Sequence, residues 1–222
     1  FSEIEYEEHL EKMRDKVASL ISICKEYGTA IRIGVNHGSL SERIVRRYGN
    51  TVEGMVMSAI EFINVCESLN FRNIVLSMKS SNVLTMVQST RLLMKRMTEA
   101  GNIYPIHLGV TEAGDFEEGV SKSAAGCGTL LCDGIGDTIR VSLTGDPIIE
   151  VPVAKAIAEF YSQTRKLKPE KCHENDNYSY LTEYNKDLHS EVVEKFTGTI
   201  YPVILNHKNL KVISDNLFLN AG

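Results

Sequence analysis

Four short apolar segments of the chain carry polar or small residues at alternate positions. The positively charged members of this alternating set are Arg32, Lys79 and Arg140. Guanidinium forks and a lysine ammonium group are suited to phosphate oxygens, and converging cations need an anion to balance their charge. We therefore predict that these residues bind an anionic ligand, and a diphosphate or a bisphosphate fits the excess of positive charge.

Two carboxylates near the same segments leave another interpretation open. Glu112 ends the third segment and Asp137 precedes the fourth. Both could neutralise the cations in a salt-bridge network, and Glu112 could instead act as an acid or base whose pKa is set by its neighbours. His107 lies deeper in the third segment, where a hydrogen-bonded core histidine is expected rather than a ligand contact.

The four segments are predicted β-strands, and each is followed by a stretch with helical periodicity or helical start signals. A further amphipathic helix precedes the first strand and stops at Gly28. Alternating strands and helices are typical of βα units around a parallel sheet. The predicted strands span residues 31–36, 73–79, 104–112 and 138–143.

Side-chain alternation along these strands favours a barrel over an open sheet. One face of every strand is aliphatic, whereas the other carries the polar set, which also includes Asn36, Thr111 and Ser142. An open sheet covered by helices on both sides should be apolar on both faces. A (β/α)8 barrel has helices outside only, and its interior can turn polar toward the carboxyl ends of the strands. We therefore predict an α/β fold that is a portion of a (β/α)8 TIM barrel.

The length sets a limit on how much of a barrel is present. The 222 residues supply about four βα units, whereas a complete barrel needs eight strands and about 250 residues. We expect residues 1–164 to form the second half of a (β/α)8 substrate-binding barrel within a longer protein. After about Gln163 the sequence becomes charged and broken, so we predict that residues 165–222 form a linker and the start of an inserted α+β module.

Composition excludes several classes of partner. The formal net charge of −5 argues against a general nucleic-acid or anionic-membrane binder, and no segment is apolar enough to span a bilayer. The odd number of cysteines and the absence of C-x-x-C spacing favour reduced thiols without a metal site, in a cytosol-like compartment. The five cysteines are Cys24, Cys66, Cys127, Cys132 and Cys172.

The loop after the first predicted strand combines small and basic residues. Gly38 and Ser39 permit a close backbone approach to a ligand. Arg43, Arg46 and Arg47 follow within one helical segment and are expected on a solvent-exposed helical face.

Five stretches, in this order, closely resemble the family of 4-hydroxy-3-methylbut-2-enyl diphosphate synthases, in the long form of plants and some bacteria. The resemblance implies an oxidoreductase of non-mevalonate isoprenoid biosynthesis, the MEP pathway. Its barrel would bind 2-C-methyl-D-erythritol 2,4-cyclodiphosphate, and a separate domain with a [4Fe–4S] cluster would reduce it with electrons from a ferredoxin or flavodoxin. The stretches are RIGVNHGSL, LSMKSSN, HLGVTEAG, KSAAGCGTLL and DGIGDTIRVSLTGDP.

The same resemblance implies roles for individual residues. Thr111 and Glu112 would lie nearest the reacting carbon, with Glu112 as the catalytic proton donor. The residues implied as diphosphate contacts are Arg32, Asn36, Lys79, Arg140 and Ser142.

The resemblance also implies that this chain carries no redox centre of its own. Family members hold the cluster by three cysteines and a glutamate in a C-terminal domain, and the five cysteines here do not match that pattern. We therefore expect no cofactor and no metal in this chain, no catalytic activity of the chain alone, and a bacterial cytoplasmic location for its parent enzyme.

Two other hypotheses stay open from the residues alone. A redox-free aldolase or isomerase would use Lys79 for a Schiff base and Glu112 for proton transfer. Half a barrel would also leave two sheet edges open, and open edges favour pairing with a second copy into a homo-oligomer.

Overall fold

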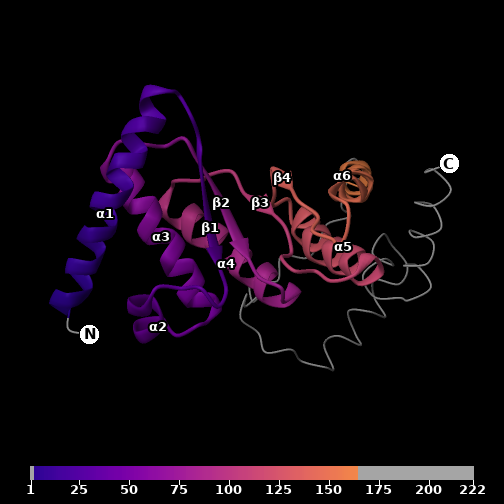
Figure 1. Cartoon of the computed structure of the whole chain (residues 1–222), viewed down its shortest axis with the longest axis horizontal. Helices are drawn as coiled ribbons and strands as arrows, with labels where there is room; N and C mark the ends of the chain where they lie inside the picture. The colour runs from indigo at the N-terminus through magenta and orange to yellow at the C-terminus, as the bar shows by residue number, and fades with distance from the viewer. Residues whose placement is uncertain (1–2, 165–222) are drawn as a thin grey trace.

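The computed structural model describes residues 3–164, which alternate between parallel strands and helices. Figure 1 shows these elements following one another across the molecule, from α1 at one end to α6 near the other. The linker and inserted module predicted for residues 165–222 lie outside the described residues. The elements are α1 (Glu3–Glu26), β1 (Ile31–Asn36), α2 (Glu42–Tyr48), α3 (Val52–Ser68), β2 (Ile74–Lys79), α4 (Val83–Ala100), β3 (His107–Leu108), α5 (Phe116–Cys132), β4 (Thr138–Ile139), the 3-10 helix η1 (Pro147–Ile149) and α6 (Glu150–Thr164).

The strands pair in the order in which they occur in the chain. β1 and β2 are parallel along their whole length, beginning with Ile31 beside Ile74. A parallel bridge between Leu76 and Ile106 continues the sheet toward β3, and β3 pairs in parallel with β4. Consecutive parallel strands connected through helices are the arrangement that βα units predict.

The first two strands match their predicted segments, whereas the third and fourth are much shorter than predicted. β3 and β4 each form a regular ladder over two residues. Backbone hydrogen bonds nevertheless keep the same register beyond these ladders, from Thr111 N to Ser80 O at 3.1 Å and from Arg140 N to Leu108 O at 2.8 Å. The third segment ends where Glu112 adopts a left-handed backbone with φ of 51°, which a continuing strand cannot accommodate.

The helices cover the aliphatic face of these strands. α3 packs against β1, α4 packs against β2, and α3, α4, α5 and α6 contact one another in sequence. Full burial of a large aliphatic side chain contributes about 1.5–3 kcal/mol, so this face supplies most of the sheet's packing energy. The buried residues of the four predicted strand segments on this face are Ile33, Val35, Ile74, Leu76, Met78, Ile106, Leu108, Val110 and Val141.

One face of the sheet is therefore apolar and covered, and the other is polar. This is the division predicted for the wall of a barrel, with helices outside and polar groups inside. Residues 3–164 do not close a barrel, because β1 and β4 each have one strand partner within this part of the chain.

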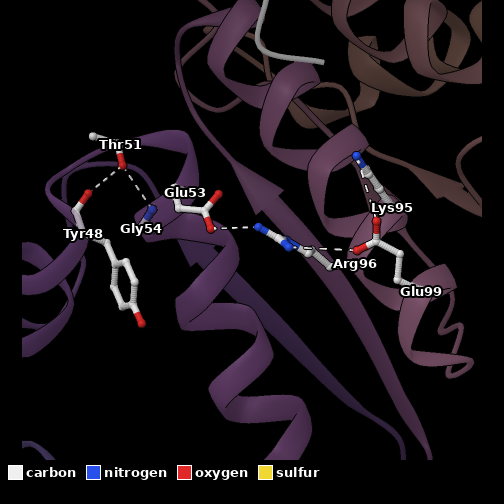
Figure 2. A network of polar contacts seen from close by, with 7 residues as sticks. All are labelled: Tyr48, Thr51, Glu53, Gly54, Lys95, Arg96 and Glu99. Atoms are coloured by element: carbon white, nitrogen blue, oxygen red, sulfur yellow. Dashed lines mark hydrogen bonds and ion pairs between the residues drawn. The ribbon is translucent and has the colours of Figure 1, made fainter. Parts of the chain in front are cut away.

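Local capping explains where two of the covering helices begin. The Thr51 hydroxyl accepts a hydrogen bond from Gly54 N and donates one to Tyr48 O, which starts α3 (Figure 2). Asn82 accepts from Thr85 N at 2.9 Å and starts α4 in the same manner. Such caps satisfy amide groups that the first turn leaves unpaired, and each is typically worth about 1 kcal/mol.

Surface charges join α3 to α4. Arg96 of α4 lies 3.2 Å from Glu53 of α3, and Glu99 is near both Arg96 and Lys95, each at 3.9 Å (Figure 2). Exposed ion pairs contribute only about 0–1 kcal/mol each. This network therefore adds little to the stability of the helix layer, which rests on the apolar packing beneath it.

Arg43 was expected on a solvent-exposed helical face, and this prediction is wrong. Its side chain is buried between α1, α2 and α3, where it pairs with Glu61 and donates to Met13 Sδ at 3.3 Å. The Tyr6 hydroxyl donates to the other oxygen of Glu61. Arginine is tolerated here because a carboxylate from α3 neutralises it.

The neighbouring basic residues follow the expectation. Arg46 and Arg47 are exposed on α2. Arg47 lies over the ring of Tyr6, 4.6 Å from its centre, and also pairs with Glu3. Burial raises the pKa of Tyr6 above its ordinary value, and the hydrogen bond to Glu61 acts in the same direction. Tyr6 is therefore a hydrogen-bond donor within this group.

Candidate functional site

The parallel register places the polar side chains in rows across the sheet. In the row nearest the carboxyl ends of the strands, Asn36 lies beside Lys79, and the continuing ladders bring Gly109 and Arg140 into line with them. Arg32 lies four residues before Asn36 on the same face of β1. We call Arg32, Lys79 and Arg140 the cation set.

The next row toward the amino ends of the strands carries no charge at neutral pH. Gly34 lies beside Ser77 in the β1–β2 ladder, and His107 lies beside Thr138 in the β3–β4 ladder. The bridge between β2 and the third segment aligns Ser77 with His107. We call Ser77, His107 and Thr138 the neutral row.

Two glycines leave room for the charged side chains on this face. A Cβ atom on Gly34 would lie 2.9 Å from Cε and 3.2 Å from Nζ of Lys79, so the lysine side chain crosses β1 at this point. A Cβ atom on Gly109 would lie 3.0 Å from the carbonyl oxygen of Arg140. Glycine within a strand often marks such a close approach.

The imidazole of His107 is the point where the cation set acts together. Burial lowers the pKa of His107, and the positive charges of Arg32, Arg140 and Lys79 lower it further. These charges come from β1, from β2 and from the segment after β4. The structure thus brings three of the residues predicted to bind an anion to one place.

None of the carboxylates within residues 3–164 forms an ion pair with the cation set. Arg140 Nη2 instead donates to the hydroxyl of Ser142 at 3.3 Å, which places another predicted binding residue beside it. Three cations without a carboxylate partner, close enough to act on one imidazole, form a site that favours an anion.

The two carboxylates that the sequence offers as counter-ions, Asp137 and Glu112, do not pair with the cation set. Asp137 accepts a hydrogen bond from Ile106 N at 2.8 Å, and its role is to hold the start of the third segment. Glu112 is exposed and forms no ion pair within the described part of the chain. The salt-bridge interpretation therefore has no support among these residues.

Glu112 also has a strained backbone. Its φ of 51° lies in the left-handed region, which costs a residue with a Cβ atom roughly 1–2 kcal/mol. Thr111 precedes it and is half-buried, with its backbone amide bonded to Ser80 O. Such strain often occurs where a side chain must be presented for function, and here it presents a carboxyl group beyond the end of the strand.

The neutral row contains an unsatisfied hydroxyl. His107 Nδ1 and Thr138 Oγ1 are 2.8 Å apart, so His107 is hydrogen-bonded as expected, although it is only half-buried. Ser77 is 1% exposed, and its hydroxyl has no hydrogen-bond partner among the described residues. Leaving a buried hydroxyl unpaired costs about 1–3 kcal/mol. Thr138 was not recognised as a site residue, because only the register between β3 and β4 reveals its proximity to His107.

The loop after β1 is attached to the end of β2. His37 N donates to Lys79 O at 2.9 Å, and Gly38 N donates to Asn50 Oδ1 at 3.0 Å. Gly38 has φ of 86°, which requires glycine for an unstrained turn. Its amide is occupied by Asn50, so the close approach predicted for Gly38 would have to use other atoms of this loop.

The described residues do not fit an iron–sulfur cluster. No group of three potential metal-ligating His, Cys, Asp or Glu side chains occurs within residues 3–164. Cys24, Cys66 and Cys127 are buried on three different helices. Burial raises the pKa of the Cys127 thiol to about 12 and also raises that of Cys66, which disfavours the thiolate that binds iron.

No helix within residues 3–164 combines the length and the apolar character needed to cross a membrane.

Comparisons with known proteins agree on one family. The GcpE TIM-barrel domain family matches residues 7–155 of this chain. A protein of Parabacteroides distasonis named 4-hydroxy-3-methylbut-2-en-1-yl diphosphate synthase (flavodoxin) is 46% identical over 209 residues, which are 94% of this chain and 34% of that protein. A protein of Leptospira interrogans with the same name is 47% identical over 206 residues, which are 91% of this chain and 31% of that protein.

A relative with a different electron donor in its name is also similar. The protein of Trichormus variabilis named 4-hydroxy-3-methylbut-2-en-1-yl diphosphate synthase (ferredoxin) is 58% identical over 159 residues, which are 72% of this chain and 39% of that protein. The chain thus spans about a third of the length of the curated relatives that it matches.

Proposed function

This chain belongs to the GcpE TIM-barrel domain family, and we propose that its whole protein is a 4-hydroxy-3-methylbut-2-en-1-yl diphosphate synthase. That enzyme would reductively convert 2-C-methyl-D-erythritol 2,4-cyclodiphosphate to the linear allylic diphosphate in non-mevalonate isoprenoid biosynthesis. In this proposal, residues 1–164 supply the second half of the substrate-binding barrel, and residues 165–222 begin an inserted module. The names of the relatives support the activity.

The observation that carries the proposal is the unbalanced cation set. Arg43, which is buried on α2, has its carboxylate partner in Glu61. Arg32, Lys79 and Arg140 act on one imidazole without such a partner within residues 3–164. A diphosphate supplies the missing negative charge and offers several oxygens to guanidinium groups on different strands.

The roles that we propose for individual residues are those that the resemblance to the family implies. Glu112, exposed beyond the end of its strand, would donate a proton near the reacting carbon, with Thr111 beside it. The residues proposed to hold the diphosphate are Arg32, Asn36, Lys79, Arg140 and Ser142.

We place the redox chemistry outside residues 3–164. The names of the relatives give flavodoxin or ferredoxin as their electron donors, and we propose a donor of the same kind for the whole protein. A [4Fe–4S] cluster would be held by another part of that protein, because the buried thiols described here do not form a ligand set.

Calorimetric titration of the whole protein tests this assignment. We expect it to bind 2-C-methyl-D-erythritol 2,4-cyclodiphosphate, and we expect Lys79→Gln and Arg140→Gln each to weaken binding at least about tenfold, because each removes a charged hydrogen bond. Arg96→Gln is the matched control, since Arg96 lies on the helix layer and pairs with Glu53 (Figure 2). Absence of binding, or equal loss in all three variants, would contradict the assignment.

Borohydride trapping distinguishes the proposed synthase from the aldolase or isomerase of the second hypothesis. A Schiff-base lysine would be trapped by borohydride in the presence of a carbonyl substrate, whereas a lysine that binds a diphosphate forms no adduct. We expect no adduct at Lys79, and mass spectrometry of peptides would detect one.

A further inference from the structure

We propose that the neutral row of Ser77, His107 and Thr138 binds one uncharged oxygen of the ligand's carbon skeleton. The chemical class is a hydroxyl or ether oxygen of a polyol diphosphate. The inference rests on the proposed function, because it adds selectivity to the same site: the cation set takes the phosphates, and the neutral row takes the polyol.

The three side chains are placed for a common contact by the sheet itself. They come from three consecutive strands and stand level with one another, with His107 between the other two. Alternation along each strand directs them to the face that carries the cation set, opposite the helices. A ligand whose phosphates contact Lys79 and Arg140 would therefore extend over this row.

Two atoms of the neutral row, Ser77 Oγ and His107 Nε2, have no hydrogen-bond partner among the described residues, and their chemistry indicates what the row would bind. The Ser77 hydroxyl is buried and without a partner within residues 3–164. His107 bonds to Thr138 through Nδ1, and no described residue forms a hydrogen bond with Nε2. A hydroxyl group can donate to one of these atoms and accept from the other, so a single ligand oxygen could satisfy both.

The charges around His107 explain why this contact would be with a neutral group. Burial and the neighbouring Arg32, Arg140 and Lys79 lower the pKa of His107, which favours its uncharged imidazole. The residues beside it in the row, Ser77 and Thr138, carry no charge. The row therefore adds directional hydrogen bonds to the site without adding to its attraction for phosphate.

Lys79 lies beside the row. The end of its side chain lies over Gly34, which is the neighbour of Ser77 on β1. A ligand whose phosphate contacts this ammonium group therefore has its carbon skeleton next to Ser77.

Two ligands and three variants of the whole protein test the proposal by calorimetry. Inorganic pyrophosphate probes the cation set alone, and 2-C-methyl-D-erythritol 2,4-cyclodiphosphate probes the cation set and the row together. We expect Ser77→Ala and Thr138→Val to weaken binding of the cyclic diphosphate about three- to tenfold, the effect of losing one hydrogen bond. Binding of pyrophosphate should change by less than about twofold.

Ser123→Ala is the matched control. Ser123 also has a buried hydroxyl without a partner among the described residues, but it lies on α5, away from the polar face. The Ser123→Ala substitution should leave the affinities for both ligands unchanged. Thermal melts establish that each variant is folded. If one of the two variants in the row fails to fold, the other still tests the proposal.

The results separate the two proposals. Unchanged affinities, or equal losses for both ligands, would overturn the neutral row while leaving the anion site intact. A wild-type protein that binds neither ligand would overturn the proposed function, and the row with it. Nitrogen NMR, at a pH where His107 stays neutral with either ligand bound, gives a second measurement: the Nε2 resonance of His107 should move further with the cyclic diphosphate than with pyrophosphate, and equal movement would count against the row.

Discussion

Gly34 and Lys79 are matched to each other across the β1–β2 pair, because a Cβ atom on Gly34 would lie 2.9 Å from Cε of Lys79. Gly34→Ala should therefore displace the end of the lysine side chain from its position over β1. We expect the affinity for the cyclic diphosphate, measured by calorimetry, to fall by about fivefold or more, since a charged hydrogen bond depends on this position. The free energy of unfolding should change by less than about 1 kcal/mol, because the displaced atoms belong to a flexible side chain.

Gly126→Ala serves as the comparison, because its added Cβ atom would meet core side chains and not the end of a flexible one. Its added Cβ atom would lie 2.8 Å from Cγ2 of Val110 and 2.9 Å from Cε of Met86, both within the core. We expect it to lower the free energy of unfolding by about 1–3 kcal/mol through overpacking. A Gly34→Ala variant that behaves like Gly126→Ala would show that Gly34 is required for packing and not for the position of Lys79.

The pKa of His107 predicts how stability changes with pH. Burial and the cation set hold this pKa below the ordinary value of 6.5, so the folded chain binds fewer protons at His107 than the unfolded chain does. The contribution to stability is therefore present above about pH 6.5 and is lost as the pH falls through the lowered pKa. Urea unfolding should show a smaller acid-side loss in His107→Gln than in the wild type.

His37→Gln is the control for this titration, since His37 is an exposed histidine of the loop after β1. Addition of pyrophosphate should raise the pKa of His107, observed by NMR, because a bound anion neutralises the neighbouring cations. An unchanged pKa at saturating pyrophosphate would show that the anion binds away from His107.

The buried pair of Arg43 and Glu61 predicts a large loss of stability on removal of one partner. Their side chains are 8% and 9% exposed. Glu61→Gln should lower the free energy of unfolding by about 3–5 kcal/mol, because it leaves the arginine charge buried without compensation. Glu53→Gln, which removes the exposed partner of Arg96, should cost less than about 1 kcal/mol. Similar losses in the two variants, measured in urea, would contradict the burial of the first pair.

The thiols predict the outcome of cluster reconstitution. Iron and sulfide added to the reduced 222-residue chain should produce no stable visible absorbance of an iron–sulfur cluster. The reason is that Cys24, Cys66 and Cys127 are buried on separate helices and do not form a ligand group. A stable cluster would contradict this expectation, and Cys172→Ser would then test the cysteine that lies outside the described residues.

Strand positions could be predicted from the sequence wherever local alternation decided them. Residues 31–36 form β1 as predicted, and β2 begins one residue after the predicted start of the second segment. The third and fourth segments are parallel strands as predicted but form short ladders, because the left-handed turn at Glu112 and the single partner of β4 are properties of the assembled sheet.

Contacts between distant residues limited what the sequence could reveal. Arg43 was misplaced because its partners, Tyr6 and Glu61, lie on α1 and α3. The relationship between His107 and Thr138 likewise depends on strand pairing over 31 residues. By contrast, alternation was sufficient to predict that Arg32, Lys79 and Arg140 share a face, because the aliphatic positions beside each of them take the face that the helices cover.

The agreement between strand order and chain order has a consequence for biosynthesis. Each strand and its helix pack mainly on the unit made just before them, so a nascent chain can add one unit after another while translation continues. Ribosomal pauses between units would then give each new strand time to find its neighbour. A synonymous change that removes such a pause would affect the yield of folded protein without altering a single side chain.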